Sequence, residues 1–407
     1  METRFLQIHS LTSYPAALLN RDDAGFAKRI PFGGAVRTRA SSQWRKRHWR
    51  DFKGENSLRE LESAWSVRSR HTFEKLIVEE LVKEGLADPL VRAGTVKVMD
   101  LILGKSLKAK KTAAKEAEEG TAETEKSTDL KTNQVTVLGR PEIEYIKRLV
   151  RNAVDGSSDE KQVLANLAPV LDRDAQKNFQ GMKLAAGLDS ALFGRMVTSD
   201  ILARCDAAVH VAHSFTVHEE SSESDYFISL DDLLRDEEGA GLGGAHINST
   251  ELTSGLFYGY VAVDVCQLIS NIEGCRPDEV NEADRELSAK VADRLIHLVA
   301  TVTHGAKLGS TAPYASASFV MAECGEAQPR SLANAFLKPV FQRPDLLGNT
   351  YEALAHFIQE ENAMYGTRFQ TKVAGMGQLK PVLDVLGIEK ASSLKDVADW
   401  AAENIRR

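Results

Sequence analysis

The stretch GLFYGYVAVDV, residues 255–265, decides the fold class, because it is the clearest strand pattern in the chain. Successive side chains of a strand point to opposite faces. One face of this strand carries the apolar side chains of Phe257, Val261, Val263 and Val265. The other face carries Tyr258, Tyr260 and Asp264. An amphipathic helix pattern over 281–303 and a further strand over 316–323 follow it.

Upstream of this stretch the chain predicts three more elements. FLQIHSLTSY, residues 5–14, reads as a strand, and Ser41 or Ser42 is a good N-cap for a helix that ends near residue 52. Alternation over 207–218 predicts another strand, followed by a long polar loop over 219–252.

Helical patterns at 57–85, 141–155 and 158–187 form a large insertion, and 331–407 is predicted to be largely helical. Without the insertion the order is β-α-β-β-α-β, the ferredoxin-like or RRM-like pattern, so we predict an α+β fold. Such a sheet leaves one face open, and in RRM modules that face meets RNA, although the RNP1 aromatic motif is absent here.

Length and composition set the broad class. The 407 residues allow two or three domains, and 43% hydrophobic and 27% charged residues are ordinary for a soluble globular protein. The four cysteines lack C-x-x-C spacing, no apolar run is long enough to cross a membrane, and the N-terminus lacks a secretory pattern. We therefore expect a cytoplasmic protein. Residues 104–136 hold almost no large apolar side chains, which predicts a mobile segment.

Charge is distributed unevenly along the chain. The net charge is -7, yet the first fifty residues hold ten Lys and Arg against three Asp and Glu. In a helix that starts near residue 42, one face would carry Gln43, Lys46, Arg47 and Arg50. The N-terminal serines, Ser41 and Ser42, would lie where a helix attracts phosphate, and Arg37 and Arg39 come just before them.

This arrangement suits a nucleic-acid backbone, which attracts many positive donors without regard to base identity. The alternative is a solvated basic face, with Trp44 and Trp49 packed in the core.

Three other groups of residues are candidates for ligand binding or catalysis. In the turn Asn20-Arg21-Asp22-Asp23, Arg21 could hold a phosphate, and the two aspartates could bind a metal or cap the turn. Gly194-Arg195-Met196 reads as a tight turn. The histidines of 207–218 do not share one strand face, and no catalytic motif accompanies them. We expect no catalytic residue, no cofactor and no metal.

A resemblance runs through most of the chain. The N-terminal string FLQIHSLTSYPAALLNRDDAGFAKRIPFGGAVRTRASSQWRKRH resembles the start of the CasC family, the repeated backbone subunit of type I-E CRISPR Cascade complexes. ALFGRMVTSD, HVAHSFTVHEESSESDYFISLDDL, ELTSGLFYGYVAVD and SLANAF continue the resemblance in the family's order. The segment 104–136 and the C-terminal part match least.

The resemblance implies a hand-like subunit. Residues 1–58 would be the first part of an RRM-like palm, and 59–187 a helical fingers insertion. Residues 188–330 would complete the palm and carry a long thumb hairpin loop at 215–254, and 331–407 would pack on the palm. Copies, commonly six, would stack along the guide RNA with the other Cascade subunits, and target DNA would pair with the guide. The thumb would displace about every sixth guide nucleotide.

The resemblance also implies contacts residue by residue. It places Arg21, Ser41, Gln43, Lys46 and Arg50 against the guide backbone, and Met196 and Phe227 as an apolar wedge at the displaced nucleotide. Arg195, beside this wedge, is predicted to bind RNA, and Lys307 would be a further contact. At 308–309 the chain has Leu and Gly where the family pattern has a second basic residue.

The main hypothesis is therefore a non-catalytic, guide-RNA-binding backbone subunit, with sequence specificity delegated to base pairing. One alternative is a metal-dependent ribonuclease subunit that uses Asp22 or Asp23. Another is a scaffold that binds only protein.

Overall fold

The computed structural model describes residues 3–103, 130–132, 134–171, 182–195, 205–229, 246–302, 305 and 308–407. The chain divides into two compact units. The first, here called the sheet unit, comprises Met1–Leu58, His210–Val263 and Ala289–Arg407. The second, the helical unit, comprises Arg59–Val209 and Asp264–Ser288. Each unit is described by itself.

A large sheet forms the centre of the sheet unit. Its strands follow the order β11-β10-β1-β9-β7-β3-β2, and β6 and β8 also pair with β9. Their bounds are β1 Phe5–Ala17, β2 Arg29–Phe32, β3 Ala35–Ala40, β6 Val209–Val211, β7 Ser214–Thr216, β8 Ser222–Ser229, β9 His246–Asp264, β10 Ala317–Gly325 and β11 Gln370–Gly375. The pairs β1/β10, β10/β11, β2/β3, β3/β7, β7/β9 and β8/β9 are antiparallel. A mixed fold of helices around an antiparallel sheet, as predicted from the sequence, is confirmed.

Three predictions about the strands need correction. The strand predicted over 207–218 is two short strands, β6 and β7, interrupted at residues 212–213. Most of the polar stretch predicted to be a loop is strand where the structure describes it, because residues 222–229 pair with 246–253. The C-terminal part contains β11, which adds a strand beside β10. Polar side chains fit an exposed strand, so hydrophobic alternation could not reveal this hairpin.

The helices of the sheet unit cover both faces of its sheet. They are α1 Ser42–Asp51, η1 Leu58–Glu60, α10 Glu286–Thr301, α11 Leu308–Thr311, η4 Leu332–Phe336, α12 Leu346–Tyr365, α13 Lys380–Leu386 and α14 Leu394–Arg406, with the ends of η1 and α10 falling in the helical unit. Leu11 of β1 packs in one core with η4 and α12. Its neighbours Ser10 and Thr12 line a cavity with residues of α1 and α10.

Because neighbouring residues of a strand point to opposite faces, α12 and α10 lie on opposite sides of the sheet. The expectation of an open sheet face is therefore wrong here: the C-terminal segment covers it. Leu332, Phe336, Tyr351 and Leu354 of η4 and α12 are buried against that face.

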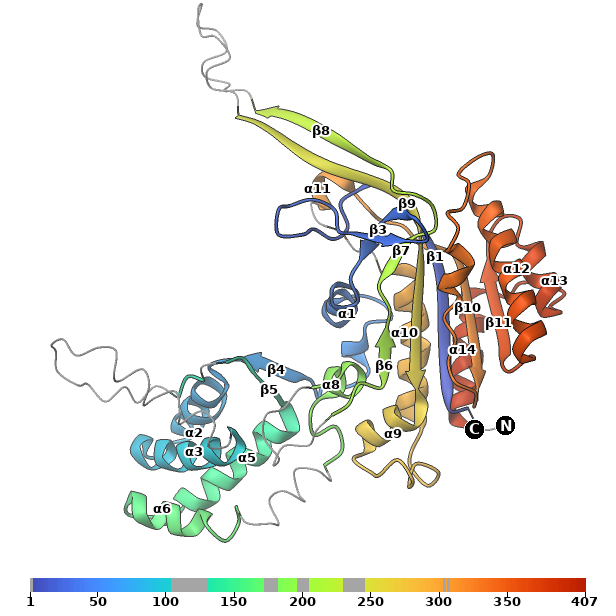
Figure 1. Ribbon diagram of the computed structural model, residues 1–407. Coiled ribbons are helices and arrows are strands. Elements are labelled where there is room, and N and C mark those ends of the chain that lie inside the picture. Colours follow the sequence, from blue (N-terminus) through green and yellow to red (C-terminus); the bar gives the residue numbers. More distant parts are fainter. Residues whose placement is uncertain are drawn as a thin grey trace, which may run out of the picture. The chain divides into compact units, whose positions relative to one another are not determined.

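β8 and the first half of β9 form a two-stranded ribbon that extends beyond the rest of the sheet (Figure 1). Its base is fastened to the β2–β3 hairpin. Arg29 Nε donates to Glu220 at 2.5 Å and its guanidinium also pairs with Glu251, while Glu251 accepts from the backbone N–H of Ala27 at 2.7 Å. The backbone N–H of Glu220 also donates to the carbonyl of Val36. The β2–β3 hairpin is thus bonded to both strands at the base of the ribbon.

The helical unit has a core of its own. Its elements are β4 Ser66–Ser69, η2 Glu74–Val78, α2 Glu79–Lys83, α3 Asp88–Leu103, β5 Thr136–Gly139, α5 Arg140–Val154, α6 Glu160–Leu167, α8 Leu188–Phe193 and α9 Val265–Glu273. Phe73, Ile77, Val98, Ile146 and Val150 are fully or almost fully buried in it. The antiparallel pair β4/β5 was not foreseen, because β4 lies in a stretch predicted to be helical.

The prediction of a mobile segment over 104–136 is wrong at its C-terminal end, where described residues are buried or lie in a strand. Residues 104–129 and 133 lie outside the described residues. Leu130 and Thr132, however, are buried, and Thr136 begins β5. The average composition of 104–136 did not reveal these buried residues, because they are few among many polar ones. Among the described residues, no helix has the length and apolar character needed to cross a membrane.

Candidate nucleic-acid interface

The basic helix α1 begins where the sequence predicts. Ser41 is its N-cap, and the Ser41 hydroxyl accepts a hydrogen bond from the Trp44 backbone N–H at 3.4 Å. The backbone N–H of Ser41 donates to Asn20 Oδ1 at 3.0 Å. This bond ties the Asn20–Asp23 turn to the start of the helix, although the two are separated by twenty residues in sequence. Two segments singled out from the sequence are thus brought together.

A surface groove lies between the turn and the helix. It has a volume of about 480 Å³ and is lined by residues 19–23, Gly25, Trp44 and Gly305. Arg21 is exposed at this groove. The Trp44 ring packs beside the His48 ring with 4.6 Å between centroids. The groove therefore combines a cation and an aromatic surface, the two features that single-stranded nucleic acid uses for binding.

The aspartates of the turn differ in role. Asp22 Oδ1 accepts from the backbone N–H groups of Ala24 at 3.0 Å and Phe26 at 2.9 Å, so this carboxylate builds the turn. Asp23 is exposed and lines the groove. In the part of the chain that the structure describes, no group of three or more His, Cys, Asp and Glu side chains is placed to hold a metal ion.

The residues predicted to form one face of α1 differ in how exposed they are. Gln43 and Arg47 are exposed, whereas Ser42, Lys46 and Arg50 are partly buried. Arg47 and Arg50 both approach Asp51, at 3.7 Å and 3.3 Å. Partial burial lowers the pKa of Lys46. Asp51 therefore offsets part of the positive charge at the C-terminal end of the helix.

Of the two arginines before the helix, only one is at the surface. Arg39 is partly exposed, and its guanidinium donates to the Arg29 carbonyl at 3.1 Å and contacts His213 Nδ1 at 2.8 Å. Arg37 is fully buried and donates to the carbonyls of Thr216 and Phe336, both at 3.0 Å. The expectation that Arg37 meets a phosphate is corrected: it joins β7 to η4. Alternation along β3 places residues 37 and 39 on the same face, so strand position alone does not distinguish the buried arginine from the exposed one.

Arg195 is also a structural residue. Its guanidinium is 1% exposed and binds the buried Glu142 carboxylate through two bonds of 2.5 and 2.8 Å. The expectation that Arg195 faces RNA is therefore corrected, since a positive charge alone does not distinguish a buried partner from a solvent-facing one. The wedge residue Met196 lies outside the described residues, as does Lys307. Phe227 lies in β8 opposite Asn248.

Sequence reasoning missed two groups at this surface. The first is the bridge from Arg29 to Glu220 and Glu251, which fixes the base of the ribbon. Its members are about two hundred residues apart, so no local pattern indicates them. The second is Arg45, which the helical pattern places off the predicted face; the structure buries it under α1. Trp49 is buried as the alternative reading expected, while Trp44 lines the groove.

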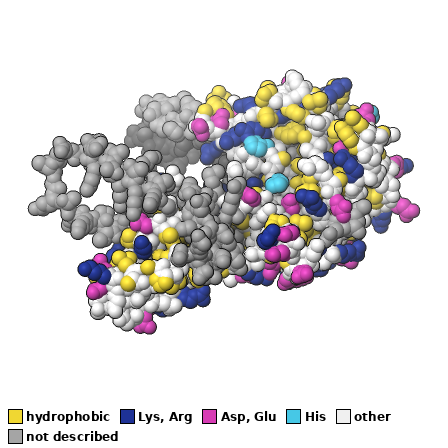
Figure 2. Space-filling view, turned by 60° about the horizontal axis from the view of Figure 1, so that its bottom comes forward, with side chains coloured by type: hydrophobic (Ala, Val, Ile, Leu, Met, Phe, Trp, Pro, Cys, Tyr) yellow, Lys and Arg dark blue, Asp and Glu magenta, His cyan; other side chains and the backbone are white. Residues whose placement is uncertain are grey.

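The charge on the surface is mixed. In the space-filling view, Lys and Arg side chains lie interspersed with Asp and Glu over the described part of the visible face (Figure 2). The excess of Lys and Arg over Asp and Glu is a feature of the first fifty residues of the sequence.

Residues 6–400 match the family model described as CT1975-like protein. The chain belongs to this family. The family assignment drawn from the sequence is thereby confirmed. No curated protein matches the chain.

Solved structures resemble this member of the CT1975-like family over nearly its whole length. One, a chain of a "CRISPR RNA-guided surveillance complex, pre-nicking", has a TM-score of 0.73 and 22% identity, covering 98% of this chain and 100% of the other. Another, from a "CRISPR RNA-guided surveillance complex", has a TM-score of 0.63 and 20% identity, covering 98% and 99%. At these identities the likeness establishes the fold.

Proposed function

We propose that this protein is a non-catalytic backbone subunit of a type I-E Cascade complex, which binds CRISPR guide RNA along its backbone. Several copies, commonly six, would line the guide with the other Cascade subunits in the cytoplasm and present it to target DNA. The observation that carries the proposal is the groove in which Arg21, Trp44 and the start of α1 come together. The similarity to chains of CRISPR RNA-guided surveillance complexes supports it.

We further propose that the sheet unit contains an RRM-like palm. The sheet neighbours β10, β1, β9 and β7 support this, because in β-α-β-β-α-β order they are strands 4, 1, 3 and 2. In this palm RNA would bind at the edge marked by α1 and the Asn20–Asp23 turn, since α12 and η4 occupy the sheet face that an RRM would use. The thumb proposed at 215–254 would include the ribbon of β8 and β9, and the fingers would be residues 59–187 of the helical unit.

Backbone recognition fits the residues available. Arg21, Arg39, Gln43, Lys46, Arg47 and Arg50 supply donors, and the N-terminus of α1, with Ser41 and Ser42, is the end of the helix whose dipole favours phosphate. Met196, Phe227 and Lys307 keep the roles that the family resemblance implies. None of these contacts selects a base, so one protein can serve any guide.

RNA binding by the purified chain tests the proposal. Lys46→Gln combined with Arg50→Gln removes two cationic contacts, and affinity for single-stranded RNA of guide length would fall. Each lost phosphate contact would also flatten the slope of log affinity against log salt by about 0.7. The matched control is Lys380→Gln with Lys390→Gln, two exposed lysines elsewhere in the sheet unit. It would leave both affinity and slope unchanged.

If both double variants lost the same amount of RNA affinity, the loss would be an effect of net charge, and the proposed site would be overturned. Absence of RNA from wild-type protein co-expressed with its partner subunits and a CRISPR array would favour the protein-only scaffold. Magnesium-dependent RNA cleavage that disappears with Asp23→Ala or Asp22→Ala would favour the ribonuclease alternative.

A further inference from the structure

A buried cation lies beneath α1, outside the groove described above. The Arg45 residue is 5% exposed, and its Nη1 finds no hydrogen-bond acceptor among the described residues. The guanidinium lies 4.8 Å from the centre of the Trp49 ring, a cation–π contact that offsets part of the cost of burial. A ring supplies no countercharge, and buried charges in proteins are ordinarily paired with an opposite charge.

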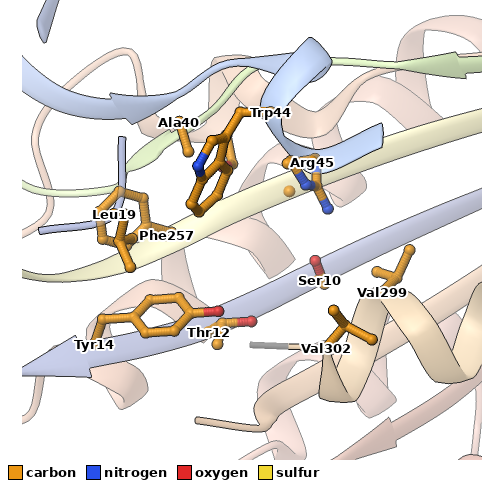
Figure 3. A pocket seen from close by; sticks show the side chains of 12 residues that line it. Ser10, Thr12, Tyr14, Leu19, Ala40, Trp44, Arg45, Phe257, Val299 and Val302 are labelled. Carbon is orange, nitrogen blue, oxygen red and sulfur yellow. The ribbon is translucent and has the colours of Figure 1, made fainter. Parts of the chain in front are cut away.

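Arg45 points into a small internal cavity of about 30 Å³ between the sheet, α1 and α10. Figure 3 shows its side chain directed toward Ser10, with Val299 of α10 and Val302, which follows that helix, across the cavity. The described residues that line this space include no Asp or Glu; its polar members are Ser10, Thr12, Tyr14, Ser214 and Arg45. Four hydroxyl groups and one guanidinium make a lining rich in donors.

The tyrosines cannot supply the missing negative charge. Burial raises the pKa of Tyr14 to about 12 and raises the pKa of Tyr258 further still, so both phenols stay protonated. Burial likewise lowers the pKa of Arg45 to about 10, which still leaves the guanidinium charged at neutral pH. Neutral phenols and hydroxyls act here as donors or dipoles rather than as counterions.

The sheet makes room for this arrangement at one position. Gly259 of β9 lies directly beneath the guanidinium, and a Cβ at this position would stand 3.0 Å from Arg45 Nη2 and 2.7 Å from Ser10 Oγ. A glycine in the middle of a strand weakens it and marks a close approach of another group. Gly259 therefore creates the space that the Arg45 head and its neighbours share.

We propose that this cavity binds a small monovalent inorganic anion, chloride under ordinary conditions, held by Arg45 and by hydroxyls from β1 and β7. The volume suits one or two water-sized occupants, which admits a halide and excludes a nucleotide or a free phosphate. Trp44 lines both this cavity and the outer groove, so an ion can reach the site past its ring. The anion would support the helix that carries the basic surface, whatever that surface binds.

Thermal unfolding at constant ionic strength tests the site, with sodium gluconate replaced stepwise by sodium chloride. Gluconate is too large for the cavity. The midpoint of wild-type protein would rise by several degrees and saturate, as expected for a ligand that binds only the folded state. Arg45→Met would lose this response, whereas the control Arg47→Met, on the exposed face of the same helix, would keep it. An equal chloride response in both variants would overturn the proposal.

If Arg45→Met does not fold, crystals of the wild-type protein soaked in sodium bromide give an independent answer. An anomalous peak within hydrogen-bond distance of Arg45 Nη1 would support the anion site. A cavity without such a peak, filled by water or empty, would overturn it.

Discussion

The buried pair of Arg195 and Glu142 gives the sharpest prediction about stability. Both side chains are almost completely inaccessible, and two hydrogen bonds of 2.5 and 2.8 Å join them. Glu142 also accepts from the Gly139 backbone N–H at 2.9 Å at the start of α5. Replacing Arg195 with Met leaves the carboxylate buried without its cation. Breaking one partner of such a pair costs about 3–5 kcal/mol.

Hydrogen exchange measured by mass spectrometry is the assay, because a chain with two compact units need not unfold in one step. The cost predicts that the slowest amides of α5 exchange about a hundredfold to several thousandfold faster in Arg195→Met. The control is Arg151→Met on the same helix. Arg151 pairs with Glu84 at 2.6 Å, but both side chains are 42% exposed, so its loss would change exchange less than about fivefold.

A second variant separates the pair from its surroundings. Glu142→Leu combined with Arg195→Met removes both charges, and its loss would be smaller than the sum of the two single losses. Unchanged exchange in Arg195→Met, or strictly additive losses in the double variant, would refute the reasoning that a stranded buried carboxylate is the cause.

Three further predictions concern other parts of the chain. Gly33→Ala would lower the unfolding midpoint far more than Gly34→Ala, because both have positive φ but only at Gly33 would a Cβ collide with the backbone carbonyl of Leu337; equal shifts in calorimetry would contradict this. Burial alone would raise the pKa of the Glu323 carboxyl, but its His and Arg partners lower it. The free energy of unfolding, measured by urea titration, would therefore decline as the pH falls below about 4.5, and Glu323→Gln would flatten this decline. An unchanged dependence on pH in the variant would refute the reasoning. Burial raises the pKa of Cys205 and Cys324 to about 12, so both thiols would react with a disulfide reagent at pH 8 only on unfolding, which the rate of thiol release in native buffer checks.

Much of the fold could be predicted from strong local patterns in the sequence. The alternation in 255–265 lies in β9, the serine cap begins α1 at residue 42, and the helix expected over 281–303 is α10. Each of these signals depends on residues within one or two turns. Hydrophobic periodicity did not reveal the ribbon strands or β11, because they are polar or short, although the family resemblance implied a hairpin loop at 215–254. What makes β11 a strand is its pairing with β10, which lies on the other side of α12 in the sequence.

The candidate site shows the same division between local and distant causes. Helical spacing correctly grouped Gln43 and Arg47 on the exposed side of α1. It could not tell that Arg37 and Arg195 are buried, because a guanidinium is equally basic in solvent and in the core. The partners that draw them inside are carbonyls of Thr216 and Phe336 in one case and Glu142 in the other, all more than fifty residues away.

The buried arginines also change the meaning of the basic N-terminal segment. Of its ten Lys and Arg residues, Arg37 and Arg45 are in the core, and Arg29 is bound to two glutamates at the ribbon base. The excess of positive charge counted from the sequence therefore overstates what a polyanion would meet. Fewer cations therefore contribute positive potential at the groove beside Trp44. The hydrogen bonds of Ser41 and Asn20 fix the turn against the start of the helix there. Position rather than total charge is what makes this surface suited to a phosphate backbone, since counterion release depends on the phosphates that cations reach.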